Sequence, residues 1–433
     1  MIDVSIAATG FCLLILMMAL GFHVAVAMFA ISIAGAVGYL GVPAALEYGT
    51  QLWGAGNNFV LTAIPLFVLL GEILVRGGFT DKMYRSLADW LYWLPGGLLH
   101  TNIVASGMLA AVSGSSVATA ATIGTIAIPA LEHRKYDQRM VLGSIAAGAT
   151  LGILIPPSIN LILYGAMTGN SVGKLYLAGI IPGILLALLF MGVIVVWGLR
   201  SPGMGSEAET VDPLGVRLRR LKDLLPPVVI FTLVMGSIYL GWATPTESAA
   251  LAVVGAFALT ALAGRLSFKM LHECFERTIL ITAMILLITS AAFYLTFVLG
   301  LMGVPEIMAD FVTRLNASPS SLILALTIFY LILGCFFDAL AMIVGTIPIV
   351  YPMTMAVGID PIWFGIFLVL MAELALITPP MGMNLYVVQG VRKEGSISTV
   401  IVGTLPFLMV MLLFVFLVFA FPFLVTWLPE VAF

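Results

Sequence analysis

Two short polar stretches interrupt segments that are otherwise apolar, and both carry residue types that bind ions. The first is Ile155-Pro156-Pro157-Ser158-Ile159-Asn160, and the second is Thr378-Pro379-Pro380-Met381-Gly382-Met383-Asn384. Two consecutive prolines remove two backbone donors and clash with the preceding turn, so a helix must break at each stretch. In hydrocarbon, a broken backbone is tolerated only where protein buries it or where it lines a wet cavity. Paired breaks therefore indicate a transporter's binding site, and a pair of purely structural kinks is the alternative.

Two further apolar stretches are split near their middles. Ser113-Gly114-Ser115-Ser116 divides residues 98–131, and Cys335-Phe336-Phe337-Asp338-Ala339 divides residues 320–350. Two half-length helices that meet at a small or polar tip are typical of a re-entrant hairpin. For the first stretch the alternative is one long helix whose small residues serve helix packing.

The residues at these tips and breaks predict the ligands. Helix C-terminal carbonyls and Ser, Thr or Asn oxygens suit Na⁺, whereas free N–H groups and positive helix ends suit a carboxylate substrate. We expect Ser113 to Thr119 to face Pro156–Asn160, and Asp338 to face Thr378–Asn384. This predicts two cation sites related by pseudo-symmetry, with an anionic substrate between them.

Four carboxylates lie in or near apolar segments. A carboxylate inside a membrane is costly to bury, so it indicates function by default. Asp338 is the strongest candidate because it lies at a predicted tip. Glu373 is either functional or a structural charge between helices, and Glu72 and Glu247 are expected to be structural.

No catalytic constellation is present in the sequence. The four histidines are scattered, and neither a Walker loop nor a Gly-x-Ser-x-Gly or His-Glu-x-x-His motif occurs. The three cysteines indicate neither a disulfide framework nor a metal cluster. We therefore expect no enzyme activity and no organic cofactor, and the absence of a basic patch with interleaved aromatics argues against nucleic-acid binding.

Composition places the whole chain in a membrane. Of its 433 residues, 62% are hydrophobic and 9% are charged, whereas about 25% of residues are charged in soluble domains. The fold class is all-α and polytopic, with about eleven spans of ~20 residues. The first span is expected to be retained because the N-terminus lacks a basic signal-peptide region. Besides the hairpins and broken segments, the expected spans cover about 3–20, 23–42, 57–75, 175–199, 225–243, 247–264, 278–302 and 399–428.

The chain divides into two halves of similar order. A hairpin at 98–131 and a broken span at 138–168 in residues 1–199 correspond to a hairpin at 320–350 and a broken span at 362–391 in residues 225–433. Gly124-Thr125-Ile126 matches Gly345-Thr346-Ile347, and an asparagine follows each Pro-Pro pair. Residues 200–224 are the long polar linker. Charged interfacial segments are expected at 80–94, Arg265–Arg277 and Pro305–Asn316.

Charge placement predicts the orientation. If each hairpin enters and leaves on one side, each half crosses the membrane an odd number of times, so the halves are inverted. The Arg-rich linker belongs in the cytoplasm by the positive-inside rule. Most other basic residues then fall inside as well, only Lys174 and Arg314 fall outside, and both termini lie outside.

Four motifs together resemble those of a known family. They are Ser-Gly-Ser-Ser-Val-Ala-Thr-Ala (113–120), Ile-Pro-Pro-Ser (155–158), Thr-Pro-Thr-Glu-Ser-Ala-Ala (244–250) and Ile-Thr-Pro-Pro-Met-Gly-Met-Asn-Leu (377–385). They look like the large membrane subunit of tripartite ATP-independent periplasmic (TRAP) transporters. The resemblance implies an elevator-type, Na⁺-driven importer of organic acids in the bacterial inner membrane. It also implies two separate partners, a small four-helix membrane subunit and a periplasmic substrate-binding protein.

The resemblance assigns roles to individual residues. Ser113, Ser158 and Asp338 would lie near the substrate. The second tip lacks the Ser-Gly-Ser-Ser of the first, so its cation site differs in detail. The residues expected to serve Na⁺ are Gly114, Ser115, Ser116, Thr119, Pro156, Asn160, Ala339, Thr378, Pro379, Met383 and Asn384.

Other functions stay open at this point. A stand-alone Na⁺/dicarboxylate or citrate-type carrier would share the inverted hairpins and would need no binding protein. An ABC-importer permease would need an ATPase and a cytoplasmic coupling loop, and an intramembrane enzyme would need an acid/base or metal cluster. The substrate could be a C4-dicarboxylate, a sugar acid, sialic acid, a keto acid, a sulfonate or an ectoine-like solute.

Overall fold

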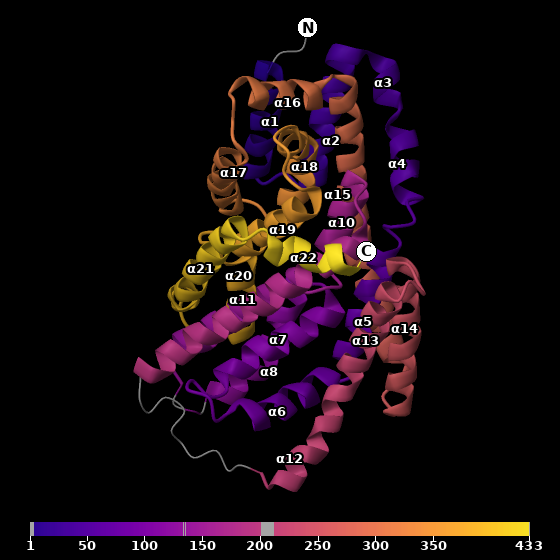
Figure 1. Ribbon diagram of the computed structural model, residues 1–433. Coiled ribbons are helices and arrows are strands. Elements are labelled where there is room, and N and C mark those ends of the chain that lie inside the picture. Colours follow the sequence, from indigo (N-terminus) through magenta and orange to yellow (C-terminus); the bar gives the residue numbers. More distant parts are fainter. Residues whose placement is uncertain (1–3, 133, 135, 201–211, 433) are drawn as a thin grey trace.

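The computed structural model describes residues 4–132, 134, 136–200 and 212–432, and within these ranges the chain is helical and contains no strand. The predicted all-α class is confirmed. Figure 1 shows one elongated molecule, with the N-terminal helices at its top and α12 at its bottom. Residues 201–211, which belong to the predicted linker, lie outside the described residues.

The first helices lie at the top of Figure 1. α1 spans Val4–Ala19, and α2 spans Val24–Gly35 and continues as a π-helical turn, Ala36–Leu40. Two short helices follow that were not expected from the sequence, α3 (Val42–Leu46) and α4 (Tyr48–Gly56). The next helix, α5 (Ala63–Arg76), begins six residues later than the predicted start at 57.

The expected interfacial segment forms α6, Phe79–Leu91, which bends from α5 by 67°. Gly78 makes the corner with a φ of +68°, a left-handed conformation that glycine adopts without strain. Thr80, Met83, Tyr84 and Leu87 are buried along one side of α6, which is the spacing of an amphipathic helix.

The first hairpin and first break form as predicted. Two short helices meet at residues 114–115, and a helix breaks at residues 155–158. The helices are α7 (Leu99–Ser113), α8 (Ser116–Glu132), α9 (Gln138–Leu154) and α10 (Ile159–Thr168).

The middle of the chain contains long apolar helices and the described end of the linker. Arg217 lies over the Trp90 ring, 4.8 Å from its centroid, and Arg220 donates to Asp89 at 2.8 Å. The hydrogen bond to Asp89 raises the pKa of Arg220. These contacts hold the end of the linker against α6. The elements are α11 (Val172–Arg200), α12 (Leu214–Arg220), a 3₁₀ turn (Leu221–Leu224), α13 (Leu225–Tyr239) and α14 (Pro245–Leu262).

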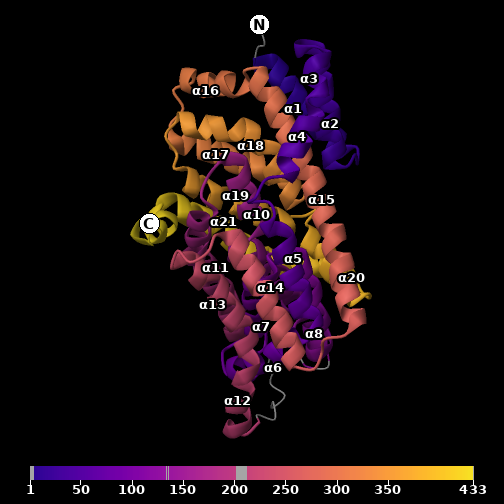
Figure 2. The same ribbon diagram turned by 90° about the vertical axis from the view of Figure 1, so that its right-hand side faces the viewer.

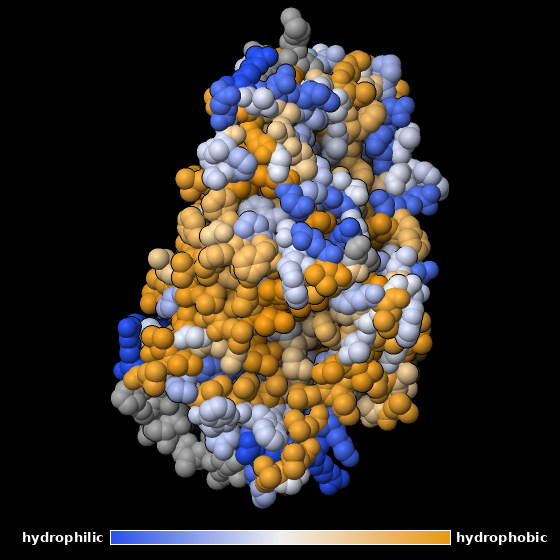
Figure 3. Space-filling model, viewed as in Figure 1, coloured by the Kyte–Doolittle hydropathy of each residue, from blue (hydrophilic) through white to orange (hydrophobic). Residues whose placement is uncertain are grey.

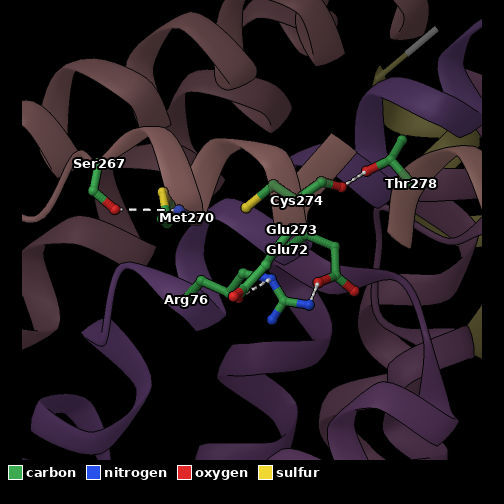
Figure 4. Close-up of polar contacts among 7 residues, drawn as sticks. All are labelled: Glu72, Arg76, Ser267, Met270, Glu273, Cys274 and Thr278. Carbon is green, nitrogen blue, oxygen red and sulfur yellow. Dashed lines mark hydrogen bonds and ion pairs between the residues drawn. The ribbon is translucent and has the colours of Figure 1, made fainter. Parts of the chain in front are cut away.

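α15 runs without interruption from Phe268 to Leu301, along most of the length of the molecule (Figure 2). The prediction of a separate interfacial segment at Arg265–Arg277 is therefore wrong. One charged side chain in the first turns of α15, Glu273, faces a charged residue of another helix. Arg76 lies 3.1 Å from Glu72 and 3.9 Å from Glu273, which joins α5 to α15 (Figure 4). Glu72 thus has the structural environment that we expected.

The second hairpin and second break close the chain. The predicted last span ends early, because Phe421–Pro422 separates two helices. The elements are α16 (Val304–Arg314), α17 (Pro319–Gly334), α18 (Ala339–Ala356), α19 (Pro361–Ile377), α20 (Met383–Arg392), α21 (Ile397–Ala420) and α22 (Phe423–Ala432).

The two amphipathic helices lie at opposite ends of the molecule, with α16 at the top of Figure 1 and α6 near the bottom. This placement is the one that inverted halves require. Each hairpin arm is 15 to 18 residues long, or about 22–27 Å at 1.5 Å per residue, which is shorter than the ~30 Å hydrocarbon layer. One arm, α18 with its 18 residues, is nevertheless among the helices long and apolar enough to cross a membrane, so re-entrance stays a prediction.

The described residues contain seven helices long and apolar enough to cross a membrane, or up to nine if each bent pair is one span. Our expected count of about eleven also includes shorter helices such as α1 and α2, so the number of crossings stays a prediction. Figure 3 shows hydrophobic side chains over much of the middle and lower part of one face. Exposed Leu188, Val196, Leu413 and Phe416 belong to α11 and α21, and such a surface suits lipid.

Candidate ion and substrate site

The first tip is a tight turn between α7 and α8. Ser113 ends α7, and Gly114 follows with a φ of +59° and donates its N–H to Ala110 O at 3.1 Å. This left-handed residue is a common helix C-cap, and glycine is its usual occupant. Ser116 then starts α8. The C-terminal carbonyls of one helix and the N-terminal amides of the next therefore meet at one point.

The first tip packs directly on the first break, as predicted. A Cβ added to Gly114 would lie 2.9 Å from the Pro157 carbonyl oxygen. A Cβ added to Gly152 would lie 3.0 Å from the Ser116 nitrogen, and one added to Gly71 would lie 3.0 Å from the Ser113 Cα. Glycines on α5, α7–α8 and α9 thus let three backbones approach one another closely.

The first break is buried and internally bonded. Ser158 caps α10 by accepting from Leu161 N at 3.4 Å, and its hydroxyl donates to the Ile153 carbonyl. Its side chain is 0% exposed. The peptide bonds Pro156–Pro157 and Pro379–Pro380 are both cis. The Ser158 hydroxyl, which we expected near the substrate, therefore donates its hydrogen within the break itself.

The second tip has a carboxylate in the capping position. Asp338 accepts from Ala341 N at 2.6 Å and starts α18. A Cβ added to Gly334, at the end of α17, would lie 2.7 Å from the Ala375 Cβ, so this tip packs on the helix that leads into the second break. Thr378 donates to Leu374 O at 2.6 Å. In contrast to the buried first break, Pro380, Met381 and Met383 are exposed.

Asn384 does not lie at the second tip. Its Nδ2 donates to Ser116 Oγ at 2.8 Å and to Ala146 O at 3.2 Å, so it reaches the first tip from the other half of the chain. Our prediction that Asn384 faces Asp338 is wrong. The helix that follows each break packs on the hairpin of the other half of the chain: α20 packs on α8, and α10 packs on α18.

The remaining predicted ligands are placed as follows. Asn160 lies in the first turn of α10 and is buried, and its Nδ2 has no hydrogen-bond partner among the described residues. Ala339 and Met383 are the first residues of α18 and α20, and Pro156 and Pro379 lie inside the breaks. Among the described residues, no side-chain hydrogen bond joins Asn160 or Ala339 to another predicted ligand, so the first tip is the better-defined of the two sites.

Three side-chain hydroxyls at the first tip use their hydrogens within the protein. Thr119 donates to Ser115 O at 2.8 Å, which leaves Ser113 as the donor in its 3.2 Å bond to Thr119. Ser116 donates to Ala149 O at 2.9 Å. Hydroxyl lone pairs remain, and Asn384 Oδ1 is buried with no hydrogen-bond partner in the part of the chain that the structure describes. Because the hydrogens of these three hydroxyls are already bonded, their oxygens can only accept or coordinate, which suits a cation.

Hard oxygen donors of this kind suit Na⁺. Within residues 4–132, 134, 136–200 and 212–432, no group of three or more His, Cys, Asp or Glu side chains could hold a metal ion.

The backbone carbonyls of Ala146 and Ala149, which accept hydrogen bonds at the first tip, were not predicted from the sequence. Their only signal is the run of small residues Ala146-Ala147-Gly148-Ala149, which also serves ordinary helix packing.

Known proteins match both the sequence and the fold. The family model described as "Tripartite ATP-independent periplasmic transporter, DctM component" matches residues 11–424. The chain belongs to this family. The predicted resemblance to the large membrane subunit of TRAP transporters is confirmed, so the chain is a multi-pass permease of a bacterial inner-membrane transporter family.

Individual relatives extend over most of the permease. It is 36% identical to the C4-dicarboxylate TRAP transporter large permease protein of Pseudomonas aeruginosa, covering 85% of this chain and 86% of the relative. It is 33% identical to the sialic acid TRAP transporter large permease protein of Vibrio cholerae, covering 88% of each. The isethionate TRAP transporter permease protein of Oleidesulfovibrio alaskensis is 32% identical and longer, since only 58% of it is covered.

A solved transporter shares the fold at low sequence identity. The Alcanivorax borkumensis YdaH transporter superposes with a TM-score of 0.62 at 16% identity, covering 87% of each chain. This likeness supports the polytopic helical architecture alone.

Proposed function

We propose that this TRAP permease imports a small organic acid anion in symport with Na⁺. The acid is delivered by a periplasmic binding protein, and a small membrane subunit on a separate chain completes the permease. The observation that carries the proposal is the set of unused oxygen acceptors at the first tip, which includes the orphan Asn384 Oδ1.

The cation would sit between the first tip and α20. Ser113, Ser116 and Thr119 offer hydroxyl oxygens, and Ser115, Gly114 and Pro156 offer backbone carbonyls near the end of α7, whose C-terminus carries partial negative charge. Because Asn384 comes from the other half, closing the site around Na⁺ would lock the first hairpin to α20. This coupling suits a transporter that must move both halves of its core together.

The second cation would sit at the second tip and second break. Asn160, Ala339, Thr378, Pro379 and Met383 are the proposed contributors there. α10, which carries Asn160, packs on α18 of this hairpin. Asp338 uses one oxygen to cap α18, so its second oxygen is the one proposed to meet Na⁺ or a polar substrate group.

The substrate would lie between the tips, near Ser113, Ser158 and Asp338. The relatives' names mention C4-dicarboxylate, sialic acid and isethionate, all of which are organic acids. We propose the class of small organic acid anions. Because the Ser158 hydrogen is bonded to Ile153 O, Ser158 would reach a substrate carboxylate only after that bond is exchanged.

Orientation follows from charge. We propose that both termini lie in the periplasm and that residues 200–224 lie in the cytoplasm, by the positive-inside rule. Reporter fusions within the linker and after residue 433 should report opposite sides. The same side for both would contradict the inverted arrangement of the halves.

Proteoliposomes test the transport proposal. The chain and its small partner should accumulate substrate only with an inward Na⁺ gradient and with the binding protein present. Uptake that persists without the binding protein would favour a stand-alone carrier. Uptake driven by ATP without Na⁺ would overturn the proposal and favour an ABC-type permease.

A further inference from the structure

Glu373 is a carboxyl group buried in the centre of the protein without a partner. Its side chain is 0% exposed, and neither Oε1 nor Oε2 has a hydrogen-bond partner among the described residues. It lies on α19, where every residue from Trp363 to Ile377 is buried. The group takes no part in the proposed ion and substrate site.

Glu373 lies beside the first break and on the helix that leads into the second. The backbone of Leu154, the last residue of α9, lies beside the carboxyl. The Leu154 carbonyl is itself closely approached by α11, because a Cβ added to Gly179 would lie 2.6 Å from it. Thr378, at the second break, follows Glu373 by little more than one helical turn. The carboxyl is therefore held between the two discontinuous spans.

No neighbouring helix supplies a counter-charge. The helices packed on α19 are α9, α10, α11, α17, α18, α20, α21 and α22. No described side chain on these helices forms an ion pair or a hydrogen bond with Glu373. Their ionisable side chains are the basic Arg139, Lys174, Arg200 and Arg392, the tyrosines Tyr164, Tyr176, Tyr330, Tyr351 and Tyr386, and Glu430.

A charged carboxylate in this position would be very unfavourable. An isolated carboxylate in an apolar medium costs far more to bury than a neutral group, so it takes up a proton instead. The neutral acid gains no hydrogen bond to another side chain in this position. A leucine or methionine would fill the same space at lower cost. What the carboxyl adds is the ability to release and rebind a proton.

We propose that Glu373 is a proton-binding site inside the moving core, in addition to the proposed Na⁺ sites. While the site is dry, the side chain keeps its proton. When water reaches it through the two adjoining breaks, the carboxyl O–H bond breaks, the proton passes to water and the carboxylate is hydrated. Before the water leaves again, the carboxylate takes a proton from water. The transport role of this site depends on the proposed function, whereas proton binding itself does not.

Infrared spectroscopy of the purified protein tests proton binding without any transport. The wild type should show the carbonyl-stretching band of a protonated carboxylic acid, and Glu373→Gln should lack that band. Glu430→Gln, which changes an exposed carboxyl on α22, is the matched control and should keep it. A wild-type spectrum identical to that of Glu373→Gln would overturn the proposal.

The pH dependence of uptake tests the role in transport. Drying the site again requires a proton, so wild-type uptake should fall as pH rises, by up to about tenfold per pH unit where one proton limits the rate. Glu373→Gln and Glu373→Met cannot titrate, so their uptake should lose this alkaline decline. Glu373→Met keeps an apolar side chain of similar size if glutamine impairs folding.

The two proposals fail in different ways. A wild-type acid band without Na⁺-driven uptake would overturn the proposed function and leave proton binding intact. Na⁺-driven uptake with the same pH profile in wild type and both Glu373 variants would overturn the transport role of Glu373 and leave the proposed function intact.

Discussion

Asn384 Nδ2 lies 2.8 Å from Ser116 Oγ, although 268 residues separate them in sequence. Asn384 is the second residue of α20, the second half of one broken helix, and Ser116 begins the second arm of the opposite hairpin. The bond therefore ties the two inverted halves together at the proposed ion site. The proposed ion site therefore needs residues from both halves of the chain, whereas two purely structural helix kinks would not need each other.

Asn384→Ala should weaken both the fold and the response to Na⁺. The change removes two donated hydrogen bonds and one orphan acceptor, and we expect a loss of about 1–3 kcal/mol for the groups left unpaired. The Na⁺ concentration for half-maximal uptake should rise, and thermal stability in detergent should fall.

The double variant with Ser116→Ala separates the bond from the general effect of each change. If the bond is the cause, the two single losses should not add, since neighbouring partners couple. Fully additive losses would mean that the residues act independently and that the link between the halves has no energetic weight.

Gly114→Ala should impair uptake more than Gly169→Ala does. Both glycines have positive φ, +59° and +72°, so alanine strains both backbones alike. Only at Gly114 would the new Cβ meet a neighbour, the Pro157 oxygen at 2.9 Å, whereas nothing lies within 4 Å at Gly169. Initial uptake rates, normalised to the amount of folded protein, compare the two. Equal effects would show that the contact between tip and break is unimportant.

Local signals predicted the tips and breaks well. The Pro-Pro pairs and the Ser-Gly-Ser-Ser stretch act through residues next to one another, so the ends of α9 and α19 and the turn at Gly114 could be placed from sequence. The pairing across halves could not. The position of Asn384 depends on how α20 packs on α8, and no local pattern encodes that choice.

The charge pattern gave a wrong prediction where a charged side chain pairs with a residue distant in the sequence. The charges at Arg265–Arg277 resemble those of an interfacial helix, yet Glu273 lies near Arg76 of α5 and α15 continues straight through. The early end of the last long helix has a local cause in Pro422, which has no N–H to donate, but a single proline inside α11 or α21 breaks neither helix. Tertiary packing decides which of these prolines ends a helix.

Arg76→Ala should lower thermal stability more than Glu72→Gln. Arg76 and Glu72 pair at 3.1 Å and are both mostly buried, with side-chain exposures of 25% and 17%. Removing the arginine leaves the Glu72 carboxylate without its partner, and losing one member of a buried pair is more costly than neutralising it. Melting in detergent measures the difference. A larger loss in Glu72→Gln would mean that the carboxylate stabilises α5 by some other contact.

Asp338→Asn and Asp338→Ala distinguish the charge at the second tip from its capping role. Asparagine caps helices as well as aspartate does and keeps an oxygen for the Ala341 N–H, whereas alanine loses the cap at a cost of about 0.5–2 kcal/mol. If the carboxylate serves Na⁺ or substrate, both variants should lose uptake or need more Na⁺, while Asp338→Asn keeps near wild-type thermal stability. Uptake measured against Na⁺ and substrate concentration, with membrane insertion checked, decides between the roles. Normal uptake by Asp338→Asn would make Asp338 a helix cap alone and would remove it from the proposed site.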